Sequence, residues 1–134
     1  AQNLGWTLDK NPVYVSPKIA ESIKRGRKFS DEAFAEACKM RTETIAYFTS
    51  FFRDFDAVLT PAASGPAPLF EEGTGNPIFS TIWTLCGLPC VTLPLLTTEA
   101  GLPMGVQLVG GAEEDDRLLR TANWMLRHLM DESE

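Results

Sequence analysis

The sequence predicts an α/β fold in which helices pack on a small mixed β-sheet. A long helix is indicated over residues 30–55, because its apolar side chains recur at steps of three, four and seven. A short apolar run, residues 57–59, ends before Pro61 and has the pattern of a buried strand. Two further apolar runs flank a turn that contains Gly101, which predicts a hairpin. Helices and strands in this order are typical of layered α/β domains.

Capping signals delimit the first helices. Ser16 is the expected N-cap of a short helix with Pro17 at its first position and Gly26 at its end. Ser30 is the expected N-cap of the long helix, and we interpret Arg41, which interrupts its apolar face, as a snorkelling side chain. That face is predicted to comprise Phe34, Cys38, Ile45, Phe48, Phe52 and Phe55.

The second half of the chain begins with a Pro- and Gly-rich loop, residues 62–76, and loops of this length are often functional. A short helix is predicted over residues 77–87, and then a strand over 89–96 in which Pro94 indicates a strand end or a sheet edge. The last helix is expected from about residue 113, with a buried stripe of Leu118, Ala122, Met125 and Leu129. Residues 1–15 and 131–134 are expected to be loop or tail.

Composition limits the classes of function. A length of 134 residues suits a single domain over residues 1–134. The net charge of −6 argues against a nucleic-acid partner, because phosphate binding needs clustered Lys and Arg. The chain lacks an unbroken apolar run of membrane-spanning length, so no membrane partner is expected. An odd number of cysteines predicts reduced thiols and a cytoplasmic location.

The residues alone give no complete catalytic or metal site. Cys86 and Cys90 lack further ligands at metal-binding spacing, so we interpret them as small apolar residues, and we expect no metal and no cofactor. Ser64 lies in the loop without the flanking glycines of a nucleophile elbow, and His128 is expected on the surface of the last helix. A hydrolase needs a nucleophile, a base and an oxyanion site together, and that combination is not evident.

An ordered series of short motifs runs through the second half of the chain. It consists of Thr60-Pro61, Thr74-Gly75, Phe79, Trp83-Thr84, Gly87-Leu88-Pro89, Pro94 and the segment GLPMGVQL at 101–108. Together with the helix pair before it, this series resembles the C-terminal part of amidase signature family enzymes. The resemblance covers residues 13–129, and its specificity lies in the ordered combination, because each piece alone is weak.

The resemblance implies a parent enzyme that hydrolyses carboxamide C–N bonds with a Ser nucleophile, a bridging Ser and a Lys base. The family carries these residues in a Gly-Ser-Ser segment and at an upstream Lys, and the sequence holds no Gly-Ser-Ser string. No catalytic residue is therefore carried over, and the chain alone is expected to be inactive. The implied role is to pack beside the active site and line the acyl pocket. Candidate substrate-binding residues are Asn76, Phe79, Ile82 and Trp83, for each of which plain core packing is the alternative.

Two classes of function stay open. The chain is either the C-terminal segment of an amidase that acts on a small-molecule amide, or a non-catalytic binding or interaction module. The second class includes a truncated relative and a subunit of the tRNA-dependent amidotransferase type. Whether this chain is itself an enzyme is open. Resemblance to the family does not determine which acyl group the amide substrate carries. Self-association of the isolated chain is expected, because uncovered apolar faces and open sheet edges favour pairing.

Overall fold

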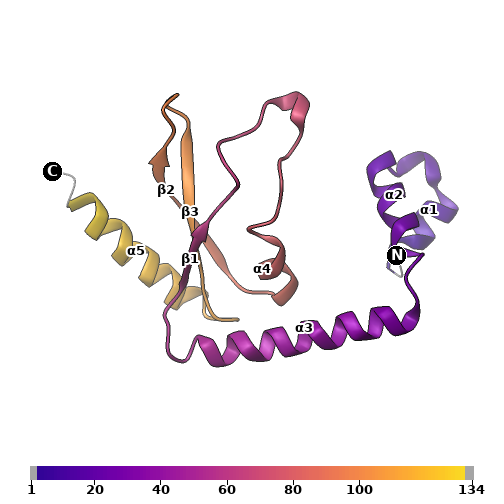
Figure 1. Ribbon diagram of the computed structural model, residues 1–134, viewed down its shortest axis with the longest axis horizontal. Coiled ribbons are helices and arrows are strands. Elements are labelled where there is room, and N and C mark those ends of the chain that lie inside the picture. The colour runs from indigo at the N-terminus through magenta and orange to yellow at the C-terminus, as the bar shows by residue number, and fades with distance from the viewer. Residues whose placement is uncertain (1–2, 132–134) are drawn as a thin grey trace. The chain divides into compact units, whose positions relative to one another are not determined.

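A computed structural model describes residues 3–131, with side chains as far as Leu129 (Figure 1). The chain divides into two compact units, one up to Met40 and the other from Arg41, and the boundary falls within a long helix. Each unit has its own internal packing. The single domain predicted over residues 1–134 stays a prediction.

The first unit is helical from near its start. It contains α1 (Gly5–Lys10), the 3-10 turn η1 (Pro12–Tyr14), α2 (Pro17–Gly26) and the beginning of α3 (Asp31–Phe51). The expected loop over residues 1–15 is therefore wrong for residues 5–10 and 12–14.

A contact with a residue outside α1 explains why this helix forms where the sequence predicts a loop. Arg27 donates from Nη2 to the Gly5 carbonyl at 3.0 Å, and the same atom lies 2.6 Å from Asp9 Oδ2. Isolated helices of this length are marginal, so a partner from the end of α2 stabilises what local propensity does not predict.

Both predicted N-caps are confirmed. The Ile19 N–H donates to Ser16 Oγ at 3.4 Å, and the Ala33 N–H donates to Ser30 Oγ at 3.2 Å. Each hydroxyl satisfies a backbone donor that the first helical turn leaves without a partner. The boundary at Gly26 is also as predicted.

Aromatic packing in the second unit is concentrated near the end of α3. Phe48 is half-buried and Phe52 is buried, whereas Phe34 and Phe55, predicted for the same face, are exposed. The helix ends at Phe51 instead of continuing to residue 55. The predicted apolar face is thus confirmed in the C-terminal half of α3 only.

Arg41 has a bound charged end as well as a long apolar stem. Its Nε donates to the Leu85 carbonyl at 2.6 Å. That carbonyl belongs to α4 (Thr81–Cys86), so Arg41 ties α3 to α4 within the second unit. Because Arg41 is exposed and this contact uses its Nε, the interpretation of a snorkelling side chain stays a prediction.

The sheet consists of β1 (Val58–Pro61), β2 (Cys90–Thr97) and β3 (Pro103–Val109) in the order β1-β3-β2. The α/β class and the β2–β3 hairpin are confirmed. Both strand pairings are antiparallel, so the mixture of directions that was expected is absent from the described strands. Pro94 lies in a register shift of the edge strand β2, which agrees with the edge position predicted from its missing N–H.

The two faces of the sheet carry separate apolar clusters. Against one face lie the end of α3 and α4, with Phe52, Cys86, Leu88 and Val109 buried. Against the other face lies α5 (Asp115–Asp131), with Leu93, Leu108, Leu118 and Ala122 buried (Figure 1). Alternate strand residues point to opposite faces, which is why neighbouring β3 residues belong to different clusters.

Helix α4 is shorter than predicted, and α5 begins and ends later than predicted. The residues before Thr81 form a turn in which the Ser80 N–H donates to the Pro77 carbonyl at 2.9 Å. Helix α4 ends at Cys86 and is followed by Gly87, which has φ of 70°. Such a positive φ suits glycine, which often follows the last residue of a helix. Helix α5 continues to Asp131, so residue 131 is helical, and residues 132–134 lie outside the described residues.

The predicted stripe of α5 is confirmed at Leu118 and Ala122, which are buried, and at Met125, which is half-buried. Leu129 is exposed. Among the described residues, no helix combines the length and apolar character needed to cross a membrane.

Candidate functional site

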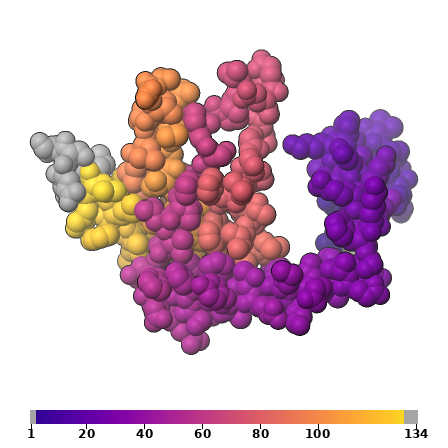
Figure 2. Space-filling model, in the orientation of Figure 1, coloured from indigo at the N-terminus to yellow at the C-terminus, as the bar shows by residue number. Residues whose placement is uncertain are grey.

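A groove of about 490 Å³ lies at the end of the sheet, where β1 finishes and β3 begins. In Figure 1 the connection from β1 to α4 rises beside the β2–β3 hairpin, and in Figure 2 these two parts stand as separate projections. Strands and connection both contribute to the lining, which comprises Leu59, Thr60, Pro61, Ala63, Ser64, Gly65, Phe79, Leu96, Met104, Gly105 and Val106.

The lining is apolar apart from two hydroxyls. None of its residues carries a charged side chain, and Thr60 and Ser64 supply the hydroxyl groups. Apolar walls with a few polar groups are the usual composition of a small-molecule site. Because neither His nor Lys nor a carboxylate lines the groove, it can hold an apolar group but supplies no general base beside Ser64.

Gly105 lets two strands approach closely at the groove. A Cβ at this position would collide with Thr92 Cγ2 of β2 and lie 3.4 Å from Ala62 Cβ. Its φ is not among the positive values, so a backbone angle restricted to glycine is not the reason for glycine at this position. The requirement for glycine here comes from the close approach of a neighbouring side chain.

Gln107 is the buried polar side chain of the described core, with 5% of its surface exposed. Its Nε2 donates to Thr60 Oγ1 at 3.2 Å and to the Phe79 carbonyl at 3.0 Å. Two groove-lining residues, one on β1 and one on the connection to α4, are therefore held by a single amide.

Sequence reasoning did not select Gln107 as a site residue. It stands between Val106 and Leu108 in an otherwise apolar strand, and a polar residue at a buried strand position was the available signal. The partner at Phe79 lies far away in the sequence, so no local pattern predicts which group the amide binds.

Of the four predicted substrate-binding residues, Phe79 lines the groove. Asn76 is exposed, and its Oδ1 accepts a hydrogen bond from the Ile78 N–H at 3.1 Å. Ile82 is partly exposed on α4, and neither it nor Asn76 is among the lining residues. The structure thus brings Phe79, and not the other predicted residues, to this groove.

Trp83 packs into the cluster on the α4 side of the sheet. Its ring meets Phe48 edge-on, with centroids 5.3 Å apart and an interplanar angle of 69°. Its Nε1 is buried and has no hydrogen-bond partner among the described residues. This packing agrees with the alternative stated for Trp83, and a contact of Trp83 with substrate stays a prediction.

Thiols and metal-binding side chains do not form a second site in the described part of the chain. Cys86 is buried, as predicted, whereas Cys90 is exposed. Although the residue as a whole is exposed, desolvation of its sulfur raises the pKa of the Cys90 thiol, so its reactive thiolate form is disfavoured. No group of three or more His, Cys, Asp or Glu able to hold a metal ion is found among the described residues.

Comparison with known proteins identifies the family. The model of the Amidase family matches residues 9–119, a range that includes every residue lining the groove. The chain belongs to the amidase family. Its resemblance to amidase signature enzymes is therefore confirmed at the level of the family.

Curated relatives of this amidase-family chain include the A subunits of glutamyl-tRNA(Gln) amidotransferase from two bacteria. The Geobacter metallireducens protein is 35% identical over 102 residues, which are 71% of this chain and 21% of the relative. The Hyphomonas neptunium protein is 31% identical over 99 residues, which are 69% of this chain and 20% of the relative. The chain thus spans about a fifth of the length of these relatives.

Solved structures agree with the family assignment. A crystal structure of an amidase aligns with a TM-score of 0.78 and 25% identity, covering 95% of this chain and 32% of the amidase. A 6-aminohexanoate cyclic dimer hydrolase aligns with a TM-score of 0.63 and 19% identity, covering 87% of this chain and 30% of the hydrolase. The second likeness concerns the fold alone.

Proposed function

We propose that this chain is the C-terminal segment of an amidase-like hydrolase and holds the acyl group of a carboxamide substrate. The observation that carries the proposal is the uncharged groove at the end of the sheet, with Phe79 in its wall. Family membership supports the chemistry, and the groove supports the part of the substrate that this segment would contact.

The composition of the groove favours an uncharged acyl group. Burying an ion against apolar walls without a partner is costly, and no lining residue offers an opposite charge. An aliphatic or aromatic acyl group loses no hydrogen bonds there and gains apolar contact. We propose an indirect contribution to this acyl pocket from the other three candidates, Asn76, Ile82 and Trp83. They act through the segment that carries Phe79.

Binding to the groove can be measured on the chain directly. Hexanamide, an uncharged aliphatic carboxamide, should shift the backbone amide signals of Phe79, Met104 and Val106 in a ¹H–¹⁵N correlation spectrum. Met104→Glu places a carboxylate in the groove and should abolish these shifts. Leu119→Glu, on the exposed side of α5, is the matched control and should leave them unchanged. Shifts scattered over the surface, or equal in both variants, would contradict the proposal.

The proposal assigns no catalytic step to this chain. Its groove contains a hydroxyl at Ser64 but no lining base that could activate it, and the family's Ser-Ser-Lys set has no match in the sequence. We therefore expect the chain alone to release no ammonia or amine from a panel of aryl and aliphatic amides. Turnover that survives further purification and disappears in Ser64→Ala would contradict this expectation.

A second candidate is a non-catalytic subunit that binds a partner protein. The curated relatives that are amidotransferase subunits favour it, because a subunit works within a complex. A net charge of −6 does not favour direct tRNA binding by this segment. The two candidates differ in what binds the chain, since the subunit candidate predicts association with a partner protein and no groove shifts with hexanamide.

A further inference from the structure

The connection between β1 and α4 is attached to the sheet at its two ends. At the first end, the Ala62 N–H donates to the Gly105 carbonyl at 3.1 Å. At the other end, Gln107 Nε2 donates to the Phe79 carbonyl at 3.0 Å. Between these points, the hydrogen bonds of the described residues are local ones.

The second attachment point is buried and comes from a side chain. Gln107 sits in the central strand β3, where its backbone is paired on both sides, opposite Thr60 and Thr92. Because the side-chain amide of Gln107 is buried and the backbone that carries it is paired on both sides, its N–H donors have little freedom to move. The position of the Phe79 carbonyl therefore follows from the position of β3.

We propose that Gln107 is a positioning residue that sets the wall of the groove by holding Phe79. This inference rests on the function proposed above for the groove. Thr60, which also lines the groove, accepts from the same amide at 3.2 Å, so one side chain fixes walls on two different segments. Gln107 does not line the groove, and its effect on a ligand passes through Phe79 and Thr60.

The test compares Gln107→Met and Gln107→Glu with the unaltered chain. Methionine keeps a similar length but removes both donors, and an ionised glutamate presents oxygen to the Phe79 carbonyl oxygen. Two readouts are measured: the ¹³C signal of the Phe79 carbonyl, which reports its hydrogen bond, and the affinity for hexanamide. We expect the signal to move in both variants and the affinity to fall about tenfold, as loss of one buried hydrogen bond allows.

A matched control separates positioning from general stability. Leu108→Ala removes a buried side chain from the neighbouring β3 position, which packs toward α5 on the opposite face of the sheet. It should lower the melting temperature but leave the Phe79 carbonyl signal and the hexanamide affinity unchanged. Thr92→Val changes the residue opposite Gln107 on β2. It should change neither the melting temperature, nor the Phe79 carbonyl signal, nor the hexanamide affinity.

Each result decides the question. An unmoved Phe79 carbonyl signal in Gln107→Met overturns the positioning role, and so does an equal loss of affinity in Leu108→Ala. If the unaltered chain shows no hexanamide response, the function proposed for the groove fails. In that case the carbonyl signal still decides whether Gln107 holds Phe79.

Discussion

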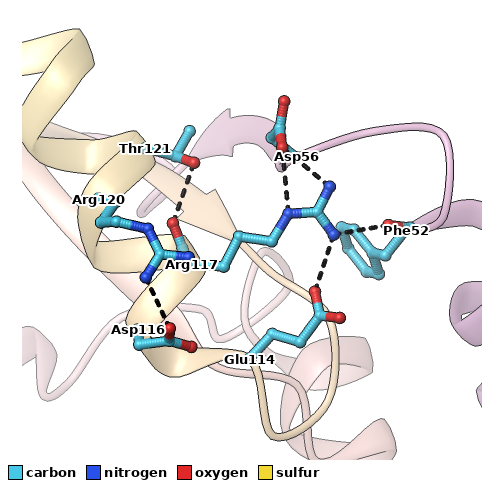
Figure 3. A network of polar contacts seen from close by, with 7 residues as sticks. All are labelled: Phe52, Asp56, Glu114, Asp116, Arg117, Arg120 and Thr121. Carbon is cyan, nitrogen blue, oxygen red and sulfur yellow. Dashed lines mark hydrogen bonds and ion pairs between the residues drawn. The ribbon is translucent and has the colours of Figure 1, made fainter.

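Arg117 and Asp56 join the first turn of α5 to the segment before β1. Arg117 Nη2 lies 2.8 Å and Nε 3.1 Å from Asp56 Oδ1, a geometry that Figure 3 shows. Nη1 of the same guanidinium donates to the Phe52 carbonyl and to Glu114 Oε2, each at 3.0 Å. The hydrogen bonds from Arg117, to Asp56 first and then to Glu114, raise the pKa of this guanidinium.

We expect Arg117→Met to lower the melting temperature more than Arg120→Met does. Arg117 bonds to Phe52 and Asp56 in the connection between α3 and β1 as well as to Glu114, whereas Arg120 pairs with Asp116 on the same exposed helix face at 2.7 Å. Exposed pairs within one helix contribute little to stability. Thermal unfolding followed by circular dichroism compares the two variants, and equal changes would show that the Arg117 contacts are ordinary surface pairs.

Acidification should destabilise the chain through Asp9 and Asp116. Hydrogen bonds from Arg27 and Arg120 respectively lower the pKa of these carboxyls below the ordinary value of 3.8. A carboxyl whose pKa is lower in the folded than in the unfolded state stabilises the folded chain at pH values above its unfolded-state pKa. This stabilisation is lost as the pH falls through the folded-state pKa. The melting temperature should therefore drop below about pH 4.

The double variant Asp9→Asn, Asp116→Asn serves as the control for this pH effect. It should lose less stability than the unaltered chain on acidification, because it has no such carboxyls to protonate. High salt should reduce the difference between the two proteins, since it screens exposed pairs. Identical pH profiles would rule out these two pairs as the source.

Gly105→Val should destabilise the second unit by about 1–3 kcal/mol, the usual range for overpacking a close contact. The added side chain would meet Thr92 on β2 and Ala62 beyond β1. Gly65→Ala is the matched control, because a Cβ there has open space and Gly65 lacks a positive φ. Denaturant unfolding measures both variants, and an unchanged midpoint for Gly105→Val would mean that β2 moves aside without cost.

Self-association of the isolated chain is expected despite its net charge of −6. Ile78 is 62% exposed and Ile82 39% exposed beside and on α4, and exposed apolar patches mark interaction sites. Light scattering over a concentration series should show a rising mean mass that Ile78→Lys reduces. Leu119→Lys on α5 is the control and should not. A monomer at every concentration would show that the exposed surface around Ile78 and Ile82 does not cause association.

Local signals were sufficient for most elements of the fold. Ser16 and Ser30 predicted helix starts because capping depends on neighbouring backbone groups only. The hairpin followed from alternation around Gly101, which adopts a φ of 80° in the turn. Helix α1 could not be predicted in this way because its stability depends on Arg27, a residue from the end of another helix.

The candidate site was less accessible from sequence. Phe79 was selected through the family resemblance, and it does line the groove. Trp83 was selected with it, but the same apolar character that suits a ligand also suits packing on Phe48. Gln107 was overlooked because Thr60 is brought to it by the strand register and Phe79 by the path of the connection between β1 and α4, and neither is visible in a local pattern.

Strand order also has a consequence for the sequence of folding events. β2 and β3 are joined by residues 98–102, where Thr98 N–H donates to the Leu102 carbonyl at 2.9 Å, so this hairpin closes a short loop. β1 reaches β3 only after the whole stretch 62–102 has been enclosed, at a larger loss of chain entropy. We therefore expect pulsed hydrogen exchange to protect hairpin amides before those of β1. The groove then forms only in the last of these steps, because residues of both β1 and β3 line it and these two strands meet late.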